Sequence, residues 1–278
     1  MVDKEGPGGS EIESKLPALD KESKKILPAP TIDDDLAIYT PSEEESKLVD
    51  TYLKDGEFSK LPPGKIIRFL RARKLDEDQF KEMLRNHVTW TNKVQPYNLL
   101  LDDVNKSAVD SGCWRYLGES DEGCPILEVR LSLWMPNEYT LDEYEVYVAF
   151  FCSMSERMMK KSSQFVVIFD MAGWAFWHAT YLNYIKSLVD IAQNQLPDRL
   201  RKVLLINTPF IFRATWAIIR PWLDPLTAAK VEFVVDEKEE VLKTLSINQK
   251  LLPIRYGGEM DEATEEKLPV PGFTIPMN

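Results

Sequence analysis

The sequence has few of the residues on which catalytic and metal sites usually depend. Its 278 residues include only two histidines and three cysteines. No Walker loop, G-x-S-x-G elbow, G-x-G-x-x-G fingerprint or H-E-x-x-H pair occurs. The cysteines Cys113, Cys124 and Cys152 lack C-x-x-C spacing, and the histidines are not spaced as their co-ligands. The sequence therefore predicts a protein that is not an enzyme, with no catalytic residues, no metal site and no cofactor.

Long hydrophobic segments are absent as well. No run of about 18 apolar residues is free of charge, so the sequence predicts no transmembrane helix. The first residues, MVDKEGPGGSEIESK, are polar and acidic and lack the apolar core of a secretory signal. Gly does not follow Met1, which excludes an N-myristoylation site. These absences predict a cytoplasmic protein whose cysteines are reduced thiols.

Acidic residues concentrate at the two ends of the chain. The net charge is −11, of which residues 1–60 carry −7 and residues 259–278 carry −4. The intervening residues 61–258 contain equal numbers of acids and bases. General binding of nucleic acid requires a surplus of basic residues. The charge pattern therefore argues against a nucleic-acid partner, although it allows a local basic pocket.

The N-terminal part of the chain is predicted to be a tail followed by helices. Residues 1–40 are rich in Pro, Gly, Ser and Asp, which predicts a flexible acidic tail. Ser42 and Glu45 have the spacing of a capping box, and Asp76 is a favourable N-cap. We expect residues 41–100 to form a small helical subdomain, with helices over residues 42–56, 65–75 and 76–94.

From residue 101 the pattern alternates between apolar strands and helices. Two strands joined by a Gly-containing turn are expected within residues 111–132, and further strands over residues 165–171, 202–209 and 230–236. Helices are expected over residues 141–161, 179–197, 208–225 and 237–245. Continuous apolar strands separated by helices predict an α/β fold with a largely parallel sheet. This domain is expected to span residues 101–260, with a C-terminal tail over residues 261–278.

Aromatic residues are plentiful in three adjoining segments. They lie in the turn AGWAFWHA, in the helix around residues 144–154, and in the segment TPFIFRATWAIIRPWLDP, residues 208–225. They could fill an ordinary core or line a ligand cavity. A helix that is apolar nearly all round must be buried or must meet something apolar on its outer face. One face against a lipid cavity and the other against a membrane would satisfy this condition.

A basic cluster precedes the third predicted helix. It consists of Lys65, Arg68, Arg71, Arg73 and Lys74. The first three residues fall along one side of a helix, which is commonly a solvated face. The last two lie where the helix ends, and cations there stabilise the helix dipole. An anionic head group such as a phosphate is the functional alternative.

Four motifs, taken together, resemble the CRAL-TRIO lipid-binding family. They are IIRFLRARKLDEDQFKEML, VVIFDMAGWAFWHA, LPDRLRKVLLINTPFIFRATWAIIRPWLDPLTAAKV and LLPIRYGG, and they extend the resemblance from about residue 45 to about residue 260. The resemblance implies a helical N-terminal bundle followed by an α/β domain whose sheet floors a hydrophobic pocket. A gating helix over Phe210 to Leu223 would close that pocket. The implied pocket and gate residues are Tyr147, Phe151, Trp174, Phe176, Trp177, His178, Phe210, Phe212, Trp216, Ile219 and Trp222.

The resemblance also implies a head-group site for phosphatidylinositol. Arg73 and Lys74 match the basic motif of the phosphatidylinositol-binding branch, and Asp198–Arg199 match an acid–arginine pair, with Asp in place of Glu. Lys230 matches a lysine after the gate. The turn GWAFWHA is similar to that of the tocopherol and retinal binders of the family. The resemblance therefore implies phosphatidylinositol together with a second, more apolar ligand, while His178 is expected to be a cap or a pocket wall rather than a haem ligand.

The predicted function is uptake of these lipids and their exchange between membranes. The expected partners are a phospholipid, another hydrophobic ligand and a transient membrane surface, with the protein monomeric, cytoplasmic and peripheral to membranes. Two alternatives stay open. One is a dedicated carrier of a sterol, a tocopherol-like molecule or haem. The other is a scaffold that presents phosphatidylinositol to a lipid kinase, with the acidic tail of residues 1–40 as its docking segment.

Overall fold

The computed structural model describes residues 29–54, 56–234, 241 and 249–261. The helices are α1 (Glu43–Lys54), α2 (Pro63–Ala72), α3 (Glu77–Val94), α4 (Lys106–Asp110), α5 (Leu141–Met158), α6 (Leu182–Gln195), α7 (Phe212–Ile219) and α8 (Pro225–Ala228). The strands are β1 (Trp114–Glu119), β2 (Pro125–Arg130), β3 (Phe165–Asp170), β4 (Leu200–Ile206) and β5 (Val231–Phe233). Short 3₁₀ turns connect several of these elements, among them η6 (Phe176–Tyr181) and η7 (Arg220–Trp222).

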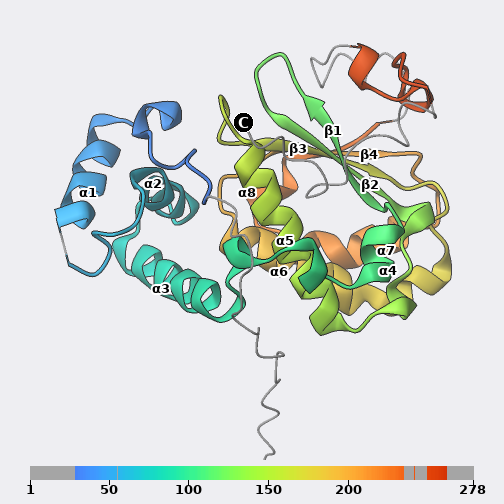
Figure 1. The fold of residues 1–278 in the computed structure, drawn as a ribbon, viewed down its shortest axis with the longest axis horizontal. Coiled ribbons are helices and arrows are strands. Elements are labelled where there is room, and N and C mark those ends of the chain that lie inside the picture. Colours follow the sequence, from blue (N-terminus) through green and yellow to red (C-terminus); the bar gives the residue numbers. More distant parts are fainter. Residues whose placement is uncertain (1–28, 55, 235–240, 242–248, 262–278) are drawn as a thin grey trace, which may run out of the picture.

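The five strands form one sheet in the order β1-β2-β3-β4-β5. The pair β1–β2 is antiparallel, while β2–β3, β3–β4 and β4–β5 are parallel. The predicted α/β fold with a largely parallel sheet is therefore confirmed. The strand β3 and the second half of β4, residues 203–206, are almost continuous apolar runs because both of their faces are buried there. In Figure 1, α5, α6 and α7 form a layer on one side of the sheet.

The other face of the sheet is covered by the C-terminal segment, residues 249–261. Leu252 and Tyr256 pack there against alternate strand residues such as Ile126 and Ile168. Their strand neighbours, such as Leu127 and Val167, point toward the helical layer instead. The strands β1 to β4 thus contribute to two separate apolar layers, and only the layer under α5, α6 and α7 encloses the site described below.

The helices α1, α2 and α3 form a small subdomain with its own core, drawn at the left of Figure 1. Tyr52, Phe58 and Phe80 make mutual ring contacts at its centre. The predicted caps are confirmed: Glu45 N donates to Ser42 Oγ at 3.1 Å, and Gln79 N donates to Asp76 Oδ1 at 3.0 Å. Sequence-local hydrogen bonds therefore determine where α1 and α3 begin.

Two predicted segments differ from the structure, and others lie outside the described residues. Residues 29–40, predicted as the end of a flexible tail, are packed: Ile32, Asp33 and Tyr39 are buried. The single helix predicted over residues 208–225 is divided into α7, η7 and α8, because Pro221 and Pro225 have no N–H to continue a helical ladder. The predicted helix over residues 237–245 and the remaining tail residues lie outside the described residues, apart from Val241.

Candidate functional site

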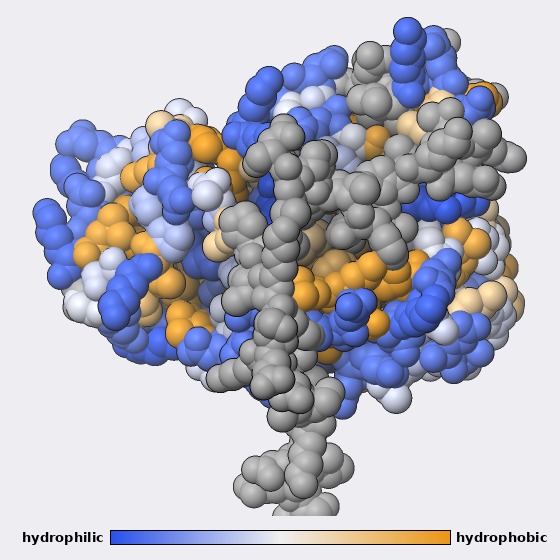
Figure 2. All heavy atoms as spheres, viewed as in Figure 1, coloured by the Kyte–Doolittle hydropathy of each residue, from blue (hydrophilic) through white to orange (hydrophobic). Residues whose placement is uncertain are grey.

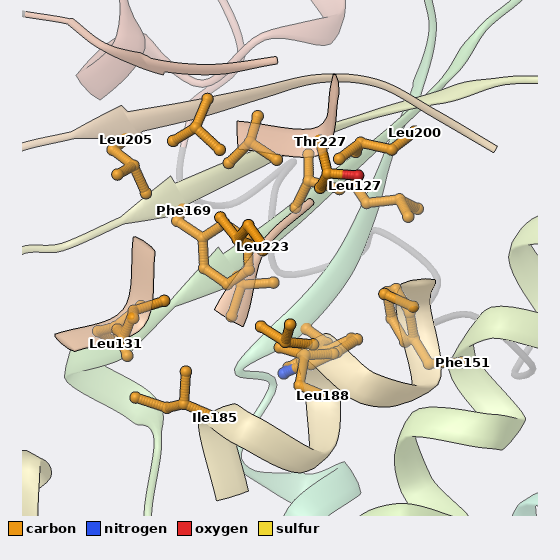
Figure 3. Close-up of a pocket in the computed structure, with 18 of the residues that line it drawn as sticks. Leu127, Leu131, Phe151, Phe169, Ile185, Leu188, Leu200, Leu205, Leu223 and Thr227 are labelled. Atoms are coloured by element: carbon orange, nitrogen blue, oxygen red, sulfur yellow. The ribbon is translucent and has the colours of Figure 1, made fainter. Parts of the chain in front are cut away.

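A cavity of about 220 Å³ lies between the sheet and the helical layer. A single water needs only about 10–15 Å³ on the same scale, so the cavity can take a much larger molecule. Its walls come from β2, β3, β4, α5, α6 and the chain after β4, as Figure 3 shows for several labelled residues. Polar side chains are few among them, for example Ser155, Gln193 and Thr227. An apolar cavity with few polar groups selects a hydrophobic ligand.

The strand periodicity supplies one wall of the cavity. Leu127 and Val129 of β2 face it, as do Val167 and Phe169 of β3, because every second residue of a strand points to the same side. The facing wall is the inner stripe of α6, which repeats at helical spacing in Ile185, Leu188, Val189, Ala192 and Leu196. Nothing in the sequence alone marks these residues as lining a site. The alternation in β2 and the stripe in α6 were available signals, but each is equally typical of an ordinary core.

The chain after β4 closes the cavity. We call residues 210–227 the gate segment. Its inward residues Phe212, Trp216, Ile219, Leu223 and Thr227 recur every three or four positions and all line the cavity. The gate segment therefore has a defined inward face, although its sequence is apolar nearly all round.

The outer surface of the gate segment is apolar with scattered cations. Phe210, Ile218 and Leu226 have exposed fractions of 77%, 49% and 61%. Arg213 and Arg220 are also exposed, and the Arg213 guanidinium lies 4.9 Å from the centre of the Phe210 ring. Hydrophobic residues are exposed elsewhere too, such as Met135, Trp177 and Ile254. Figure 2 shows an orange band across the larger lobe.

The predicted pocket and gate residues fall into two groups. Those that line the cavity are Phe151, Trp174, Phe212, Trp216 and Ile219. The remaining six do not line it, and they are Tyr147, Phe176, Trp177, His178, Phe210 and Trp222.

Tyr147 and Trp222 lie close to the cavity without lining it. Tyr147 is buried behind the wall, with its ring 5.6 Å from that of Trp114. Trp222 is half-buried at the end of η7. Phe176 and Trp177 are exposed on η6, with Phe176 exposed by 74%. The exposed residues are thus placed to meet something outside the protein rather than a ligand in the cavity.

His178 is enclosed by tryptophan rings. Its ring lies 5.0 Å from Trp174 and 5.7 Å from Trp134 and is nearly parallel to both, and these two tryptophans line the cavity. Ala175 N donates to His178 Nδ1 at 2.9 Å, which closes the first turn of η6. Burial lowers the pKa of His178, so the ring is neutral. His178 therefore supports the cavity wall from behind.

Four charged side chains form a buried cluster beside the cavity. Arg199 Nη2 lies 2.9 Å from both Asp33 Oδ1 and Glu156 Oε1, and Arg68 Nη2 lies 2.9 Å from Asp33 Oδ2. Burial alone would raise the pKa of Asp33, but the charges of Arg68 and Arg199 outweigh it and hold that pKa well below its usual range. We call these residues the ion cluster. It joins the segment before α1 to α2, α5 and the start of β4.

Gly64 shows how tightly the ion cluster is enclosed. A Cβ at this position would collide with the ring of Tyr39 and the backbone of Asp33. Gly64 N instead donates to Asp33 O at 2.8 Å, and Arg199 Nη1 donates to the Tyr39 hydroxyl at 2.8 Å. The segment before α1 therefore lies directly on α2 and is held there by the cluster.

Three of the predicted head-group residues lie at the start of β4, and they are Asp198, Arg199 and Lys230. Lys230 Nζ donates to Leu200 O at 2.5 Å, and both Leu200 and Thr227 line one end of the cavity (Figure 3). Asp198 Oδ2 lies 3.8 Å from Arg71 Nη1. This contact brings the end of α2 against the same turn.

The two predicted pairs of head-group residues differ in exposure. Arg73 and Lys74 follow α2 directly; Arg73 is half-buried and Lys74 is exposed. Arg199 is completely buried, and its charge is already paired with the two carboxylates of the ion cluster. Asp198 and Arg199 therefore do not pair with each other. Arg199 instead fixes the turn between Asp198 and Leu200.

Within the described part of the chain, no group of three or more His, Cys, Asp or Glu residues could hold a metal ion. None of the described helices is long and apolar enough to cross a membrane.

Comparisons with known proteins agree on one family. The sequence model of the CRAL/TRIO domain matches residues 110–258, more than half of the chain. The SEC14 cytosolic factor of Candida glabrata is 30% identical over 232 residues, which cover 75% of this chain and 75% of that protein. The alpha-tocopherol transfer protein-like protein of Homo sapiens is 29% identical over 209 residues, 72% of this chain and 60% of that protein.

A further relative and a solved structure extend the comparison. The phosphatidylinositol transfer protein CSR1 of Eremothecium gossypii is 27% identical over 229 residues, 77% of this chain and 50% of that protein. The chain thus spans only about half of the latter relative. The crystal structure of Sfh5 is similar with a TM-score of 0.63 and 13% identity, and the match covers 80% of each chain. This last likeness concerns the fold alone, and it agrees with helices preceding a largely parallel sheet.

Proposed function

The chain belongs to the CRAL/TRIO domain family, and from that premise we propose that it is a cytoplasmic, monomeric lipid carrier. It takes up phosphatidylinositol and a second hydrophobic ligand in its cavity and exchanges them between membranes. The observation that carries the proposal is the apolar cavity closed by the gate segment, with Lys230 beside one end. The relatives support it, since they include a phosphatidylinositol transfer protein and an alpha-tocopherol transfer protein-like protein.

The cavity addresses the main barrier to lipid exchange. Each CH₂ group moved from an apolar environment into water costs about 0.8 kcal/mol, so a two-chain lipid does not leave a bilayer unaided. Walls such as Leu127, Val167 and Leu205 replace the bilayer interior around the acyl chains. No bond is made or broken in this process, and no catalytic group is required.

The head group is proposed to bind at the cavity end next to Leu200 and Thr227. Lys230 provides a cation there, and we propose that Arg73 and Lys74, which follow α2, add positive charge. Cations of this kind bind phosphate oxygens through charge-assisted hydrogen bonds. We propose that Asp198 accepts hydrogen bonds from the inositol ring, while Arg199 acts indirectly by holding the turn in place.

The outer face of the gate segment is proposed to meet the membrane. Phe210, Ile218 and Leu226 are exposed apolar side chains, and Arg213 and Arg220 lie among them. Apolar side chains flanked by arginines are typical of a surface that rests in the head-group region of a bilayer. Opening of the gate segment at that surface would let the lipid pass between bilayer and cavity without crossing water.

The decisive experiment is to identify what the purified protein carries. The protein is produced in a eukaryotic host and extracted with organic solvent, and the extract is analysed by mass spectrometry. We expect phosphatidylinositol in near-stoichiometric amount in the wild type and its loss in Lys230→Ala. Lys202→Ala is the matched control, because the charge of Lys202 is already paired with Glu232 at 2.6 Å.

Other outcomes of this extraction favour the alternatives. A sterol, a tocopherol-like compound or haem as the sole ligand, unaffected by Lys230→Ala, would contradict the head-group site and indicate a dedicated carrier. A partial deletion of the acidic tail distinguishes simple transfer from the scaffold alternative. If the protein is a transfer protein, a variant lacking residues 1–28 should still transfer phosphatidylinositol between vesicles. That truncation leaves the buried Ile32, Asp33 and Tyr39 in place.

A further inference from the structure

One polar side chain of the cavity wall holds the end of the gate segment. Gln193 of α6 lies among the apolar lining residues. Its Nε2 donates to Trp222 O at 2.9 Å, and its Oε1 accepts from Asp224 N at 2.7 Å. A single amide thus binds two backbone groups on either side of Leu223, whose side chain lines the cavity.

The gate segment cannot satisfy these backbone groups itself. In a continuous helix, Trp222 O would accept from the N–H of residue 226, but Leu226 N donates to Asp224 Oδ1 at 2.9 Å instead. The helical ladder is already interrupted at this point, because Pro225 has no N–H. The break between η7 and α8 therefore leaves one carbonyl and one N–H for a partner outside the segment, and Gln193 is that partner.

The rest of the gate segment is held by contacts with little directionality. Phe212 packs edge-on against Trp174 at 5.1 Å, and Trp216 packs against Phe233 at 5.4 Å. Such apolar contacts can slide and be replaced by lipid chains, whereas a two-point amide clamp is either made or broken. The clamp is therefore suited to separate a closed state from an open one.

We propose that Gln193 is a positioning residue that latches the gate segment shut and limits the rate of lipid exchange. The proposal rests on the exchange function proposed above. Opening the gate segment breaks both hydrogen bonds of the amide and exposes Trp222 O and Asp224 N to water. In the closed state the same bonds hold Leu223 against the cavity.

Two substitutions test the latch. Gln193→Met keeps the length of the side chain and removes both hydrogen bonds. Gln193→Glu keeps the acceptor for Asp224 N and removes the donor to Trp222 O. The matched control is Asn194→Met, which introduces the same side chain at the exposed neighbouring position of α6. Each variant is compared with wild type by amide hydrogen exchange and by transfer of pyrene-labelled phosphatidylinositol between phosphatidylcholine vesicles.

The expected result is local opening with faster transfer. In Gln193→Met, amide exchange around residues 223–226 and the transfer rate should both rise about fivefold or more, from the loss of two hydrogen bonds. Gln193→Glu should give a smaller rise in both, and Asn194→Met should match wild type. The amides of β3 should stay as protected as in wild type, which shows that the fold is intact. A purely structural role for Gln193 would lower the transfer rate instead.

The latch is overturned if exchange around residues 223–226 is the same in Gln193→Met as in wild type. It is equally overturned if that exchange accelerates while transfer stays constant or slows. If Gln193→Met also increases amide exchange in β3, Gln193→Glu replaces it as the variant that is compared with wild type. Should the wild type itself fail to transfer phosphatidylinositol, the proposed function fails, and hydrogen exchange still decides whether Gln193 holds the gate segment closed.

Discussion

The ion cluster lies behind the cavity wall at Ser155 and Leu200, whereas the gate segment forms part of that wall, and the two regions are stabilised by opposite means. The ion cluster holds the start of β4 with buried, fully paired charges that link Asp33, Arg68, Glu156 and Arg199. The gate segment is held mainly by apolar packing, and it has exposed apolar side chains such as Phe210. Charges in a dry interior tolerate little displacement, because each loses its partner when it moves.

This difference in stabilising interactions indicates that the ion cluster is rigid and that the gate segment can rearrange. The turn between Asp198 and Leu200, where the head group is proposed to bind, belongs to the rigid side. The gate segment, through which the lipid is proposed to pass, belongs to the side that can rearrange at low cost. Substitutions in the ion cluster should therefore reduce stability, whereas substitutions on the gate segment should alter binding or exchange at nearly constant stability.

The largest effect is expected for Arg199→Met. The substitution leaves the carboxylates of Asp33 and Glu156 buried without one of their cations, which should lower the free energy of unfolding by about 3–5 kcal/mol. Urea denaturation followed by circular dichroism measures this loss. Arg201→Met is the control, since Arg201 is 46% exposed and pairs with an exposed Glu122, so a loss below about 1 kcal/mol is expected. Equal losses in the two variants would contradict a special role for the ion cluster.

A smaller, pH-dependent effect is expected from His87 on the same side of the molecule. Burial first, and then the charge of Lys65, lower the pKa of His87 to about 3. The ring stays neutral in the folded protein, where its Nε2 lies 3.2 Å from Lys65 Nζ and its Nδ1 3.0 Å from Gln195 Oε1. In the unfolded chain the pKa returns to about 6.5, so below that pH the unfolded state binds a proton that the folded state does not.

His87 should therefore contribute stability that is full above pH 6.5 and declines as the pH falls. The decline is about 1.4 kcal/mol per pH unit, or about 2 kcal/mol between pH 6.5 and pH 5. Urea titrations across this range should show the slope in wild type and most of it removed in His87→Gln. The slope that remains comes from His178, whose pKa is also lowered by burial, and near pH 5 from carboxyl groups with lowered pKa values such as Glu45 and Glu143. An unchanged slope in His87→Gln would show that His87 is not held neutral.

The ion cluster and the gate segment differ in how much of their structure could be predicted from the sequence. Local signals were sufficient for the caps at Ser42 and Asp76 and for the largely parallel sheet, because hydrogen bonds and periodicity between near neighbours decide them. The ion cluster was not predictable, since it joins Asp33 to Arg199 across 166 positions of sequence. Arg199 was selected by resemblance alone, and no pattern in the sequence distinguishes a buried, paired arginine from an accessible one.

The gate segment was predictable in composition but not in geometry. Its aromatic content indicated a special role, yet periodicity did not reveal which residues face inward, because both sides of the helix are apolar in sequence. The division into α7, η7 and α8 depends on Pro221 and Pro225 together with the amide of Gln193. That amide lies 29 positions before Trp222, so local sequence contains no sign of it.

The smallest effect on stability, and the sharpest test of the comparison, is expected for the outer face of the gate segment. Phe210→Ser and Ile218→Ser remove apolar groups that are already exposed, so the free energy of unfolding should change by no more than about 0.5 kcal/mol. Complete insertion of Phe210 or Ile218 into a bilayer is worth about 1.5–3 kcal/mol for each side chain, so even partial insertion of the two should make the double variant bind vesicles at least about tenfold more weakly. Sedimentation with phosphatidylcholine vesicles containing phosphatidylinositol measures the affinity.

The matched control for this test is Met135→Ser, a change at another exposed apolar residue that lies outside the gate segment. If Met135→Ser weakens binding as much as the double variant, the membrane contacts the protein through a broader surface than the gate segment. If the double variant unfolds more easily, Phe210 and Ile218 support the fold after all. Weaker vesicle binding of the double variant at unchanged stability would support the distinction between the gate segment and the ion cluster. It would show that the outer face of the gate segment contacts the membrane without being needed to maintain the cavity.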